Sequence, residues 1–509
     1  MSVRIFSASI TGIDAQLIDV EVDSTPGLHS FNIVGLPDKA VEESKERIAS
    51  AIRNNNLMPP SAKHKKIIIN LAPADIRKEG PAYDLPIAVG YLLETEQIKF
   101  DSAGKMFMGE LSLDGAVKPV SGVLSAALMA SERGFNEIIV PAGNTREAAL
   151  VSGLRVIGVT DINQLMGHLN GISPIKASRP TQIVSHEHSG DSFRLIKGQE
   201  SAKRALMIAA AGGHNVLMSG PPGSGKTLLA RALVDLMPPM AFGEALGVTR
   251  IYSSIGTPIT SSVMSERPFR SPHHTTSAPA MVGGGTNPRP GEISLAHRGV
   301  LFLDELPEFP RSVLESLREP LEEGRITVSR ASGSVNLPAK FTLVAAMNPC
   351  PCGNYGSQTA CLCSPISVIR YRKRISGPLL DRLDIQINVP RETAASEKQA
   401  ISEATFRDLK ERIKTAKSLQ EKRFDGTGIY TNAEISYKNI DQFCKLVPSA
   451  EQLLVRAAEV KGLSLRAYHK IKKLGRTIAD LEGAETIENK HIAEAISLNV
   501  NDKLLGEFS

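Results

Sequence analysis

The sequence has no tryptophan, and aromatic residues make up only 5% of its 509 residues. Stacking of bases on an aromatic platform is therefore not the expected mode of any nucleic-acid binding. No uninterrupted apolar run is long enough to span a bilayer. Arg4, Asp14 and Asp19 interrupt the N-terminus before an apolar core of signal-peptide length appears. We therefore expect a cytoplasmic protein without a membrane partner.

The excess of one sign of charge over the other is also small, because the chain carries 59 basic and 54 acidic residues and a formal net charge of +5. This mild excess is compatible with nucleic acid but does not indicate it. Hydrophobic residues make up 42% of the chain, enough for ordinary cores, and the length suggests about three domains of roughly 150 residues each. We expect a first domain at 1–172, a polar linker at 173–190, a core at 191–390 and a helical, charged segment at 391–509.

One segment matches a complete phosphate-binding loop, G-x-x-x-x-G-K-T. An apolar run typical of a buried strand precedes it and a helical pattern follows it, which makes an ordinary turn the weaker alternative. Glycine-rich backbone and the start of the helix favour bound phosphate. Lys226 is expected to neutralise phosphate charge, and the Thr227 hydroxyl to ligate Mg²⁺. Every residue of the loop is expected to bind nucleotide: Gly220, Pro221, Pro222, Gly223, Ser224, Gly225, Lys226 and Thr227.

A second apolar strand, 299–303, ends in the carboxylates Asp304 and Glu305, which is the Walker B pattern. We expect Asp304 to hold Mg²⁺ and Glu305 to orient and polarise the attacking water. An acidic pair that merely ends a strand is the alternative, but the phosphate loop favours catalysis. The sequence thus predicts an ATPase with ATP and Mg²⁺ as its cofactors.

Three further polar residues are candidates for contact with the γ-phosphate. Asn348 ends another buried strand, where its amide would act as a sensor. Arg382 lies between a helix and a strand, and an arginine placed there could reach the nucleotide of a neighbouring subunit. The alternative is a surface arginine paired with Asp381 or Asp384. Arg466 lies on a helix of the C-terminal segment and could contact phosphates from a lid.

Four of the five cysteines form a C-x-C…C-x-C pattern. Four thiolates satisfy tetrahedral Zn²⁺, and in a reducing compartment such a cluster favours a metal over disulfides. The spacing is tighter than in the usual C-x₂-C pairs, and reduced free thiols are the alternative. We predict a structural zinc site made by Cys350, Cys352, Cys361 and Cys363. A basic run follows, and it either contacts DNA or forms a solvated helix start: Arg370, Arg372, Lys373 and Arg374.

The order of these elements resembles the AAA+ superfamily, and within it the branch of magnesium chelatases and MCM helicases. The Walker A and Walker B segments are far apart, which leaves room for an insertion. His273 and His274 lie in this insertion, and we expect them to face a channel or the nucleotide rather than to bind a metal. Residues 325–340 are typical of a β-hairpin just before the sensor strand. In helicases of this branch such a hairpin touches DNA, which implies that Arg330, at the predicted tip, contacts DNA; a solvated tip is the alternative.

Four segments resemble the ComM (YifB) family, and the resemblance covers essentially the whole chain: 267–275, 291–298, 348–353 and 476–483. It implies a hexameric ring that translocates on DNA and drives ATP-dependent branch migration, which extends the heteroduplex during natural transformation. The implied partners are single-stranded and branched DNA, other copies of the chain and recombination proteins. A motor subunit of magnesium chelatase and a protein-remodelling ATPase are the alternatives.

The segments 77–86 and 108–122 resemble the proteolytic domain of Lon proteases. Ala82 stands where Lon has its nucleophilic serine, and Leu124 where Lon has its catalytic lysine, so both members of the dyad are absent. The expected fold class is therefore α/β. It comprises a Lon-protease-like α+β domain without peptidase activity, an AAA+ P-loop core with a parallel sheet, and a C-terminal helical lid.

Overall fold

The computed structural model describes residues 2–62, 64–181, 190–256, 264–285, 288–330, 333–356, 360–391 and 401–499, and for residues 330 and 333 the backbone alone. The chain divides into two units, Met1–Val184 with Ala241–Ser265 and Gly285–Pro290, and Ser185–Met240 with Glu266–Gly284 and Gly291–Ser509. No helix within the described ranges is long and apolar enough to cross a membrane. Part of the predicted linker 173–190 lies outside these ranges, and the predicted domain boundaries stay a prediction.

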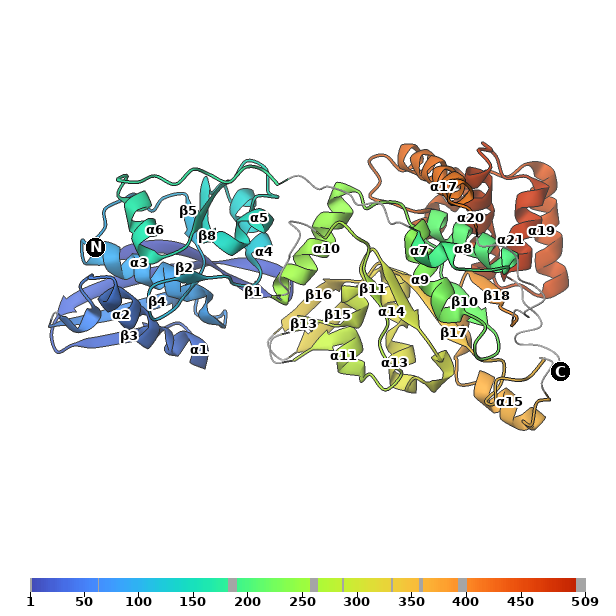
Figure 1. The fold of residues 1–509 in the computed structure, drawn as a ribbon, viewed down its shortest axis with the longest axis horizontal. Helices are drawn as coiled ribbons and strands as arrows, with labels where there is room; N and C mark the ends of the chain where they lie inside the picture. Colours follow the sequence, from blue (N-terminus) through green and yellow to red (C-terminus); the bar gives the residue numbers. More distant parts are fainter. Residues whose placement is uncertain are drawn as a thin grey trace. The chain divides into compact units, whose positions relative to one another are not determined.

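A seven-stranded mixed sheet forms the first unit, in the order β3-β4-β2-β1-β5-β8-β9 (Figure 1). β2 pairs antiparallel with both β1 and β4, and the other neighbours run parallel. The five residues of β8 are all buried, as expected for a parallel strand covered on both faces. The strands are β1 (Val3–Thr11), β2 (Asp14–Pro26), β3 (Ser30–Val34), β4 (Lys65–Ala72), β5 (Lys105–Phe107), β8 (Glu137–Pro141) and β9 (Arg155–Val159), with β6 (Glu110–Leu111) and β7 (Val117–Lys118) paired separately.

Helices of the first unit bury apolar side chains against this sheet. In β4, buried Ile67, Ile69 and Leu71 alternate with more exposed residues, so one face of this part of the sheet packs inward. The helices are α1 (Lys39–Glu42), α2 (Ser44–Asn54), α3 (Asp84–Glu94), α4 (Val123–Glu132), α5 (Thr145–Ala148), α6 (Ile162–Leu169) and α10 (Phe242–Ser254).

Helix α10 belongs to the first unit although it follows the phosphate loop in the sequence. Arg250 donates to the Asp14 carboxylate at 2.6 Å and to Ile13 O at 3.1 Å. The Gly122 N–H donates to Ser253 O at 2.9 Å. These hydrogen bonds place α10 against the core of the first unit.

A five-stranded parallel sheet forms the second unit, in the order β11-β14-β17-β10-β18 (Figure 1). The strands are β10 (Val216–Ser219), β11 (Phe269–Arg270), β14 (Val300–Leu303), β17 (Thr342–Met347) and β18 (Ile385–Asn388). Every residue of β10, β14 and β17 is buried, which explains their continuous apolar sequences. The predicted α/β class with a parallel P-loop sheet is therefore confirmed. In such sheets ligands bind beyond the carboxyl ends of the strands.

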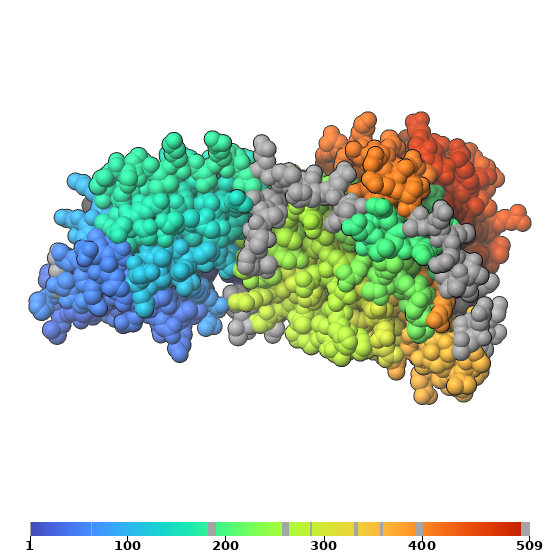
Figure 2. All heavy atoms as spheres, viewed as in Figure 1, coloured from blue at the N-terminus to red at the C-terminus, as the bar shows by residue number. Residues whose placement is uncertain are grey.

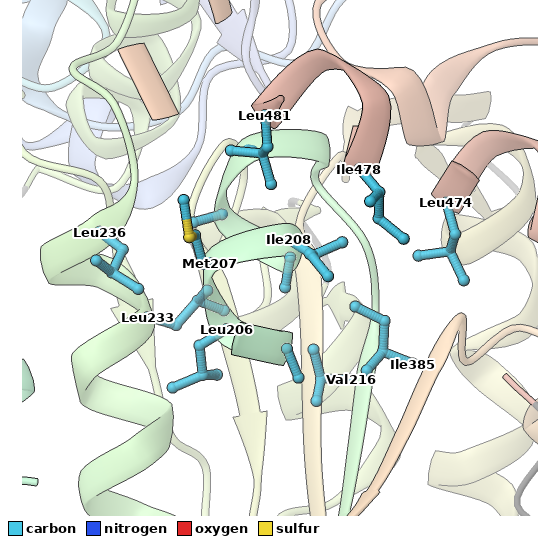
Figure 3. Close-up of a cluster of buried hydrophobic side chains, with 14 of the residues drawn as sticks. Leu206, Met207, Ile208, Val216, Leu233, Leu236, Ile385, Leu474, Ile478 and Leu481 are labelled. Carbon is cyan, nitrogen blue, oxygen red and sulfur yellow. The ribbon is translucent and has the colours of Figure 1, made fainter. Parts of the chain in front are cut away.

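Helices from distant parts of the sequence cover this sheet and share one core (Figure 3). Figure 3 draws Leu206, Met207 and Ile208 of α8 near Leu474, Ile478 and Leu481 of α20, with Val216 of β10 below them. The helices of the second unit, of which α7, α8, α9 and α17 to α21 contribute to this core, are α7 (Asp191–Arg194), α8 (Glu200–Gly212), α9 (Lys226–Leu236), α11 (Ala278–Val282), α12 (Glu292–Leu295), α13 (Arg311–Ser316), α14 (Arg318–Glu323), α15 (Pro365–Arg372), α16 (Gly377–Leu380), α17 (Glu403–Arg423), α18 (Ile440–Phe443), α19 (Pro448–Lys461), α20 (Leu465–Leu481) and α21 (Asn489–Asn499).

The C-terminal helices also form a buried polar network. Asp480 of α20 is 1% exposed and accepts hydrogen bonds from Arg423, Arg476 and Asn432. Arg476, also 1% exposed, donates further to the carbonyls of residues 484 and 485. This network explains why the segment 476–483 carries an arginine and an aspartate one helical turn apart. The segment predicted to be helical at 391–509 contains the long helix α17, from Glu403 to Arg423.

Candidate functional site

The phosphate loop lies at the carboxyl end of β10, inside the parallel sheet. The backbone N–H of Gly220 donates to Met347 O at 3.2 Å, and a Cβ at Gly220 would lie 2.2 Å from Val389 O, so only glycine fits there. Gly225 caps α9 with φ +87°, a left-handed conformation that favours glycine, and a Cβ there would meet open space. The sheet thus fixes one side of the loop and leaves room for phosphate oxygens on the other.

The Lys226 side chain connects the loop to the predicted sensor. Its Nζ donates to three oxygens, Gly220 O at 2.8 Å, Pro221 O at 3.0 Å and Asn348 Oδ1 at 3.3 Å. Burial lowers the pKa of Lys226, while the charges of Asp304 and Glu305 oppose this shift. A phosphate group beside this ammonium would further stabilise its charged form. The loop and Lys226 therefore fit the phosphates of a nucleotide.

The Walker B carboxylates face the loop because β14 and β10 both flank β17. Thr227 Oγ1 donates to Asp304 Oδ2 at 3.2 Å. A hydroxyl and a carboxylate at this distance are oxygen ligands of the kind that Mg²⁺ prefers. Lys226, Thr227, Asp304 and Asn348, which are distant in the sequence, thus lie together at one edge of the sheet.

Glu305 has an unusual backbone and a partner that the sequence did not indicate. Its φ is +53°, in a left-handed region that costs a non-glycine residue about 1–3 kcal/mol and is typical of functional sites. His274 Nδ1 lies 3.3 Å from Glu305 Oε2, and the rings of His273 and His274 contact each other at an interplanar angle of 35°, with centroids 4.1 Å apart. His274 follows β11, the neighbour of β14, so its place after a parallel strand was the signal that could have revealed this contact.

The two arginines predicted to contact phosphate share one carboxylate. Arg382 and Arg466 each bond to one oxygen of Glu322, and the Arg466 Nη2–Glu322 Oε1 distance is 2.7 Å. Within the described ranges, Arg382 pairs with neither Asp381 nor Asp384, the partners of the alternative interpretation. Nor does either arginine pair with the phosphate loop or the Walker B carboxylates of its own chain in those ranges.

The predicted hairpin is present as β15 (Arg325–Arg330) and β16 (Gly333–Pro338), paired antiparallel from Arg325–Pro338 to Arg330–Gly333. Val328 and Ile326 are buried, so the hairpin packs one face inward. Arg330 is the last residue of β15, as expected for a residue at the tip. Its side chain lies outside the described part of the structure, and its contact with DNA stays a prediction.

The four clustered cysteines come together at one point. Three of their sulfur–sulfur distances are 3.4, 3.6 and 3.7 Å, and all four sulfurs lie within 4.8 Å of one another. These distances approach the edge of about 3.8 Å of a tetrahedron with Zn–S bonds of about 2.3 Å. The residues are Cys350, Cys352, Cys361 and Cys363, so the predicted zinc ligands fit the metal.

The ionisation of the cluster also fits a cation. The backbone of Asn354 and the neighbouring thiols lower the pKa of Cys352 to about 6. A backbone hydrogen bond from Cys363 favours the Cys361 thiolate, but burial and the thiols of Cys352 and Cys350 outweigh it and raise the pKa of Cys361 to about 12. One thiolate therefore opposes the formation of the next, and a divalent cation would remove this repulsion.

The cysteine segment packs against the phosphate loop. A Cβ at Gly353 would lie 2.5 Å from Pro222 Cδ, and Gly353 has φ +82°. Arg372 of the following helix α15 donates to Pro349 O at 3.2 Å and lies over the Tyr355 ring at 5.2 Å. In Figure 2 this orange-yellow part of the chain lies at the surface of its unit. Arg372 therefore has a role inside the protein, and so does Arg374, which pairs with Glu308 at 2.6 Å.

In the first unit, Ala82 lines a cavity of about 680 Å³, together with Asp38, Glu110 and Glu147. Burial raises the pKa of Glu147. Leu124, the second residue that replaces a Lon catalytic group, is fully buried in the core. Neither Ala82 nor Leu124 offers a nucleophile or a base, and the predicted lack of peptidase activity stays a prediction.

Comparisons with known proteins assign a family to each part of the chain. The family model for magnesium chelatase subunit ChlI matches residues 192–397, a second ChlI subunit model matches 20–144, and the ChlI C-terminal model matches 403–499. A 38 kDa subunit of the magnesium chelatase of Rhodobacter capsulatus is 29% identical, over 31% of this chain and 50% of that protein.

Two relatives match along the whole length. The chain is 41% identical to the competence protein ComM of Haemophilus influenzae, over 99% of both proteins. It is 42% identical to the uncharacterized protein YifB of Escherichia coli, over 97% of this chain and 96% of that one. Similarity to these proteins therefore includes both units, whereas similarity to the Rhodobacter subunit covers about a third of the chain.

Proposed function

The chain belongs to the ComM (YifB) family of magnesium-chelatase-like AAA+ proteins, and from this we propose that it is an ATP-driven motor that migrates branches in DNA. One observation carries the proposal: the chain matches a competence protein over its full length and has a β-hairpin between the Walker B strand and Asn348. The motor would extend heteroduplex DNA during homologous recombination in natural transformation.

ATP hydrolysis is the proposed source of the work. When bound, ATP and Mg²⁺ supply the phosphoryl group and the cation that neutralises its charge. The loop backbone and Lys226 bind the phosphates, and Thr227 and Asp304 hold the cation. Glu305 orients and polarises the attacking water, while Asn348, which already contacts Lys226, detects the γ-phosphate. The close approach of these side chains at one sheet edge supports these roles.

We further propose that hydrolysis needs a neighbouring copy of the chain in a hexameric ring. Arg382 and Arg466 share Glu322 and have no described pairing with their own nucleotide site. An arginine supplied in trans stabilises charge on the transferred phosphoryl group and is worth about 10³–10⁵ in rate. Both arginines would therefore act on the nucleotide of the adjoining subunit.

The hairpin β15–β16 is the proposed contact with DNA. Arg330 lies at the end of β15, where a cation would bind the phosphate backbone without reading sequence. A motor must move along any sequence, so contact with the backbone suits this task.

The cysteine cluster is the proposed site of one structural zinc ion. Zinc held by four thiolates would fix residues 350–363, and the contact between Gly353 and Pro222 would transmit this rigidity to the phosphate loop. The proposed function of the metal is therefore to support the nucleotide site and not to take part in the chemistry.

Migration of a synthetic branched DNA junction by the purified protein tests the proposal. The native protein is expected to resolve a labelled four-way junction in the presence of ATP and Mg²⁺, and Lys226→Ala is expected not to. The second candidate is the motor subunit of a magnesium chelatase, which the match to ChlI models favours. An ATPase that no DNA stimulates, and that leaves the junction intact, would reject the DNA motor in favour of the chelatase function.

A further inference from the structure

Glu322 is the common partner of the two arginines that the proposed ring mechanism requires. Its Oε1 accepts a hydrogen bond from Arg466 and its Oε2 accepts one from Arg382. Arg382 Nη1 also donates to Pro378 O at 2.6 Å, and Arg466 Nε donates to the Tyr437 hydroxyl at 3.4 Å. The hydrogen bond from Arg382 lowers the pKa of Glu322, so the carboxylate is charged at neutral pH. One charged side chain thus holds both arginines.

The strength of this pairing suits an exchangeable contact. Glu322 is 47% exposed in its side chain and Arg466 is 33% exposed. Exposed ion pairs of this kind are weak, because water competes for both charges. The negative charge of a nucleotide in an adjoining subunit would be a stronger partner for a guanidinium, since charge-assisted bonds to phosphate are often bidentate. The more exposed pair with Arg466 is therefore easily exchanged for such a phosphate, whereas Arg382, whose side chain is 10% exposed, exchanges Glu322 only for this stronger, charge-assisted bond.

Glu322 is also joined to the hairpin β15–β16 by a short and rigid connection. It lies on α14, which ends at Gly324, and β15 begins at the next residue. The Gly324 N–H donates to Pro320 O at 2.9 Å, which closes the end of the helix. The Thr327 N–H donates to Glu319 Oε1 at 3.2 Å, which ties the first strand of the hairpin to the same helix. These two hydrogen bonds link the hairpin to the helix that carries Glu322.

We propose that Glu322 is a positioning residue that couples the hairpin β15–β16 to Arg382 and Arg466. This rests on the proposed function. In a subunit without DNA, Glu322 holds both arginines back from the adjoining nucleotide. A DNA backbone that moves the hairpin moves α14 and weakens this hold, so that the arginines reach the adjoining γ-phosphate. Glu322 does not touch nucleotide or DNA and acts only through the two arginines.

Glu322→Gln tests the coupling, because it keeps the shape of the side chain and removes its charge. ATP hydrolysis is measured for the full chain at ring-forming concentration, with and without a branched DNA junction. The DNA-free rate is expected to rise by about threefold, the factor that an exposed ion pair is worth, and the stimulation by DNA to shrink accordingly. In the Arg466→Ala background the same substitution is expected to raise the DNA-free rate by a smaller factor, since only the contact of Glu322 with Arg382 is then left to lose.

Glu323→Gln is the matched control. Glu323 is the next residue of the same helix and pairs with Arg325, at 2.9 Å, and not with Arg382 or Arg466. It is expected to keep the native ratio of rates with and without DNA. Glu322→Asp, which keeps the charge, is expected to restore most of the DNA dependence.

Two results would overturn the proposal in distinguishable ways. If Glu322→Gln changes the rates with and without DNA by the same factor, Glu322 does not couple the hairpin to the arginines, even though the protein remains a DNA motor. If DNA does not stimulate ATP hydrolysis by the native protein, the proposed DNA motor is contradicted. The coupling, which depends on that function, is then contradicted as well. Gel filtration shows whether each variant still assembles.

Discussion

Replacement of Asp480 by asparagine tests how the C-terminal helices are held to one another. Asp480 is 1% exposed, and its two oxygens accept four N–H groups from side chains of three residues. The donors are Arg423 Nη1 at 2.9 Å and Nη2 at 2.6 Å, Arg476 Nε at 3.0 Å and Asn432 Nδ2 at 2.8 Å. Asp480→Asn keeps the volume of the side chain but leaves two guanidinium groups without their counter-charge.

The expected loss is large because Arg476 is as deeply buried as Asp480. Burial already lowers the pKa of Arg476, which shows that its surroundings disfavour an unpaired cation. Removing one partner of a buried ion pair costs about 3–5 kcal/mol. Asparagine retains some hydrogen bonds, so we expect the lower end, about 3 kcal/mol, or a melting temperature lower by about 5 °C in a unit of this size.

Calorimetry is the appropriate assay, since the chain has no tryptophan to report unfolding by fluorescence. The two units need not melt together, so the relevant transition is the one whose melting temperature ATP raises. Asp441→Asn is the matched control, because Asp441 pairs with Lys472 at 2.9 Å while its side chain is 84% exposed. An exposed pair is worth less than about 1 kcal/mol. Equal melting temperatures for the two variants would refute the reasoning.

Three further predictions concern the nucleotide site and the cysteine cluster. Lys226→Ala is expected to weaken ATP binding by at least about tenfold, because it loses a charge-assisted bond to phosphate. Glu305→Gln is expected to keep ATP binding and to lose hydrolysis. Rapid hydrolysis by Glu305→Gln would remove Glu305 from the mechanism. Cys361→Ser is expected to lower bound zinc, measured by atomic absorption, well below one ion per chain. Cys444→Ser changes a buried cysteine outside the cluster and is expected to leave the zinc content unchanged. A native protein without metal would contradict the zinc site. His274→Gln should change the ATPase rate by at most about fivefold, the worth of one partly exposed polar contact. A far larger loss would mean that His274 takes part in the chemistry.

Local patterns predicted the elements of the second unit well. Continuous apolar runs predicted β10, β14 and β17, because strands buried on both faces of a parallel sheet leave no polar position. The phosphate loop 220–227 could be recognised from the sequence alone, since phosphate binding needs glycine and lysine at fixed spacing in one short segment. The ComM (YifB) resemblance read from short segments was confirmed along the full chain.

Contacts between distant segments were harder to predict. The alternative interpretation of Arg382 named its chain neighbours Asp381 or Asp384 as partners, whereas the observed partner is Glu322. Likewise, nothing local to His274 indicated Glu305. Side-chain pairing across a fold depends on how elements pack, and sequence spacing alone does not encode that packing.

The sequence by itself determined the phosphate loop, the Walker B carboxylates, the cysteine spacing and the family. Each of these depends only on a short run of residues or on the order of such runs along the chain. Only the tertiary structure decided that α10 packs on the first unit, that the cysteine segment supports the phosphate loop through Gly353 and Pro222, and that Glu322 joins Arg382 to Arg466. The physical reason is that a periodic pattern specifies which face of an element is buried. Which other element packs against that face depends on how all the elements of the folded chain fit together in shape and charge.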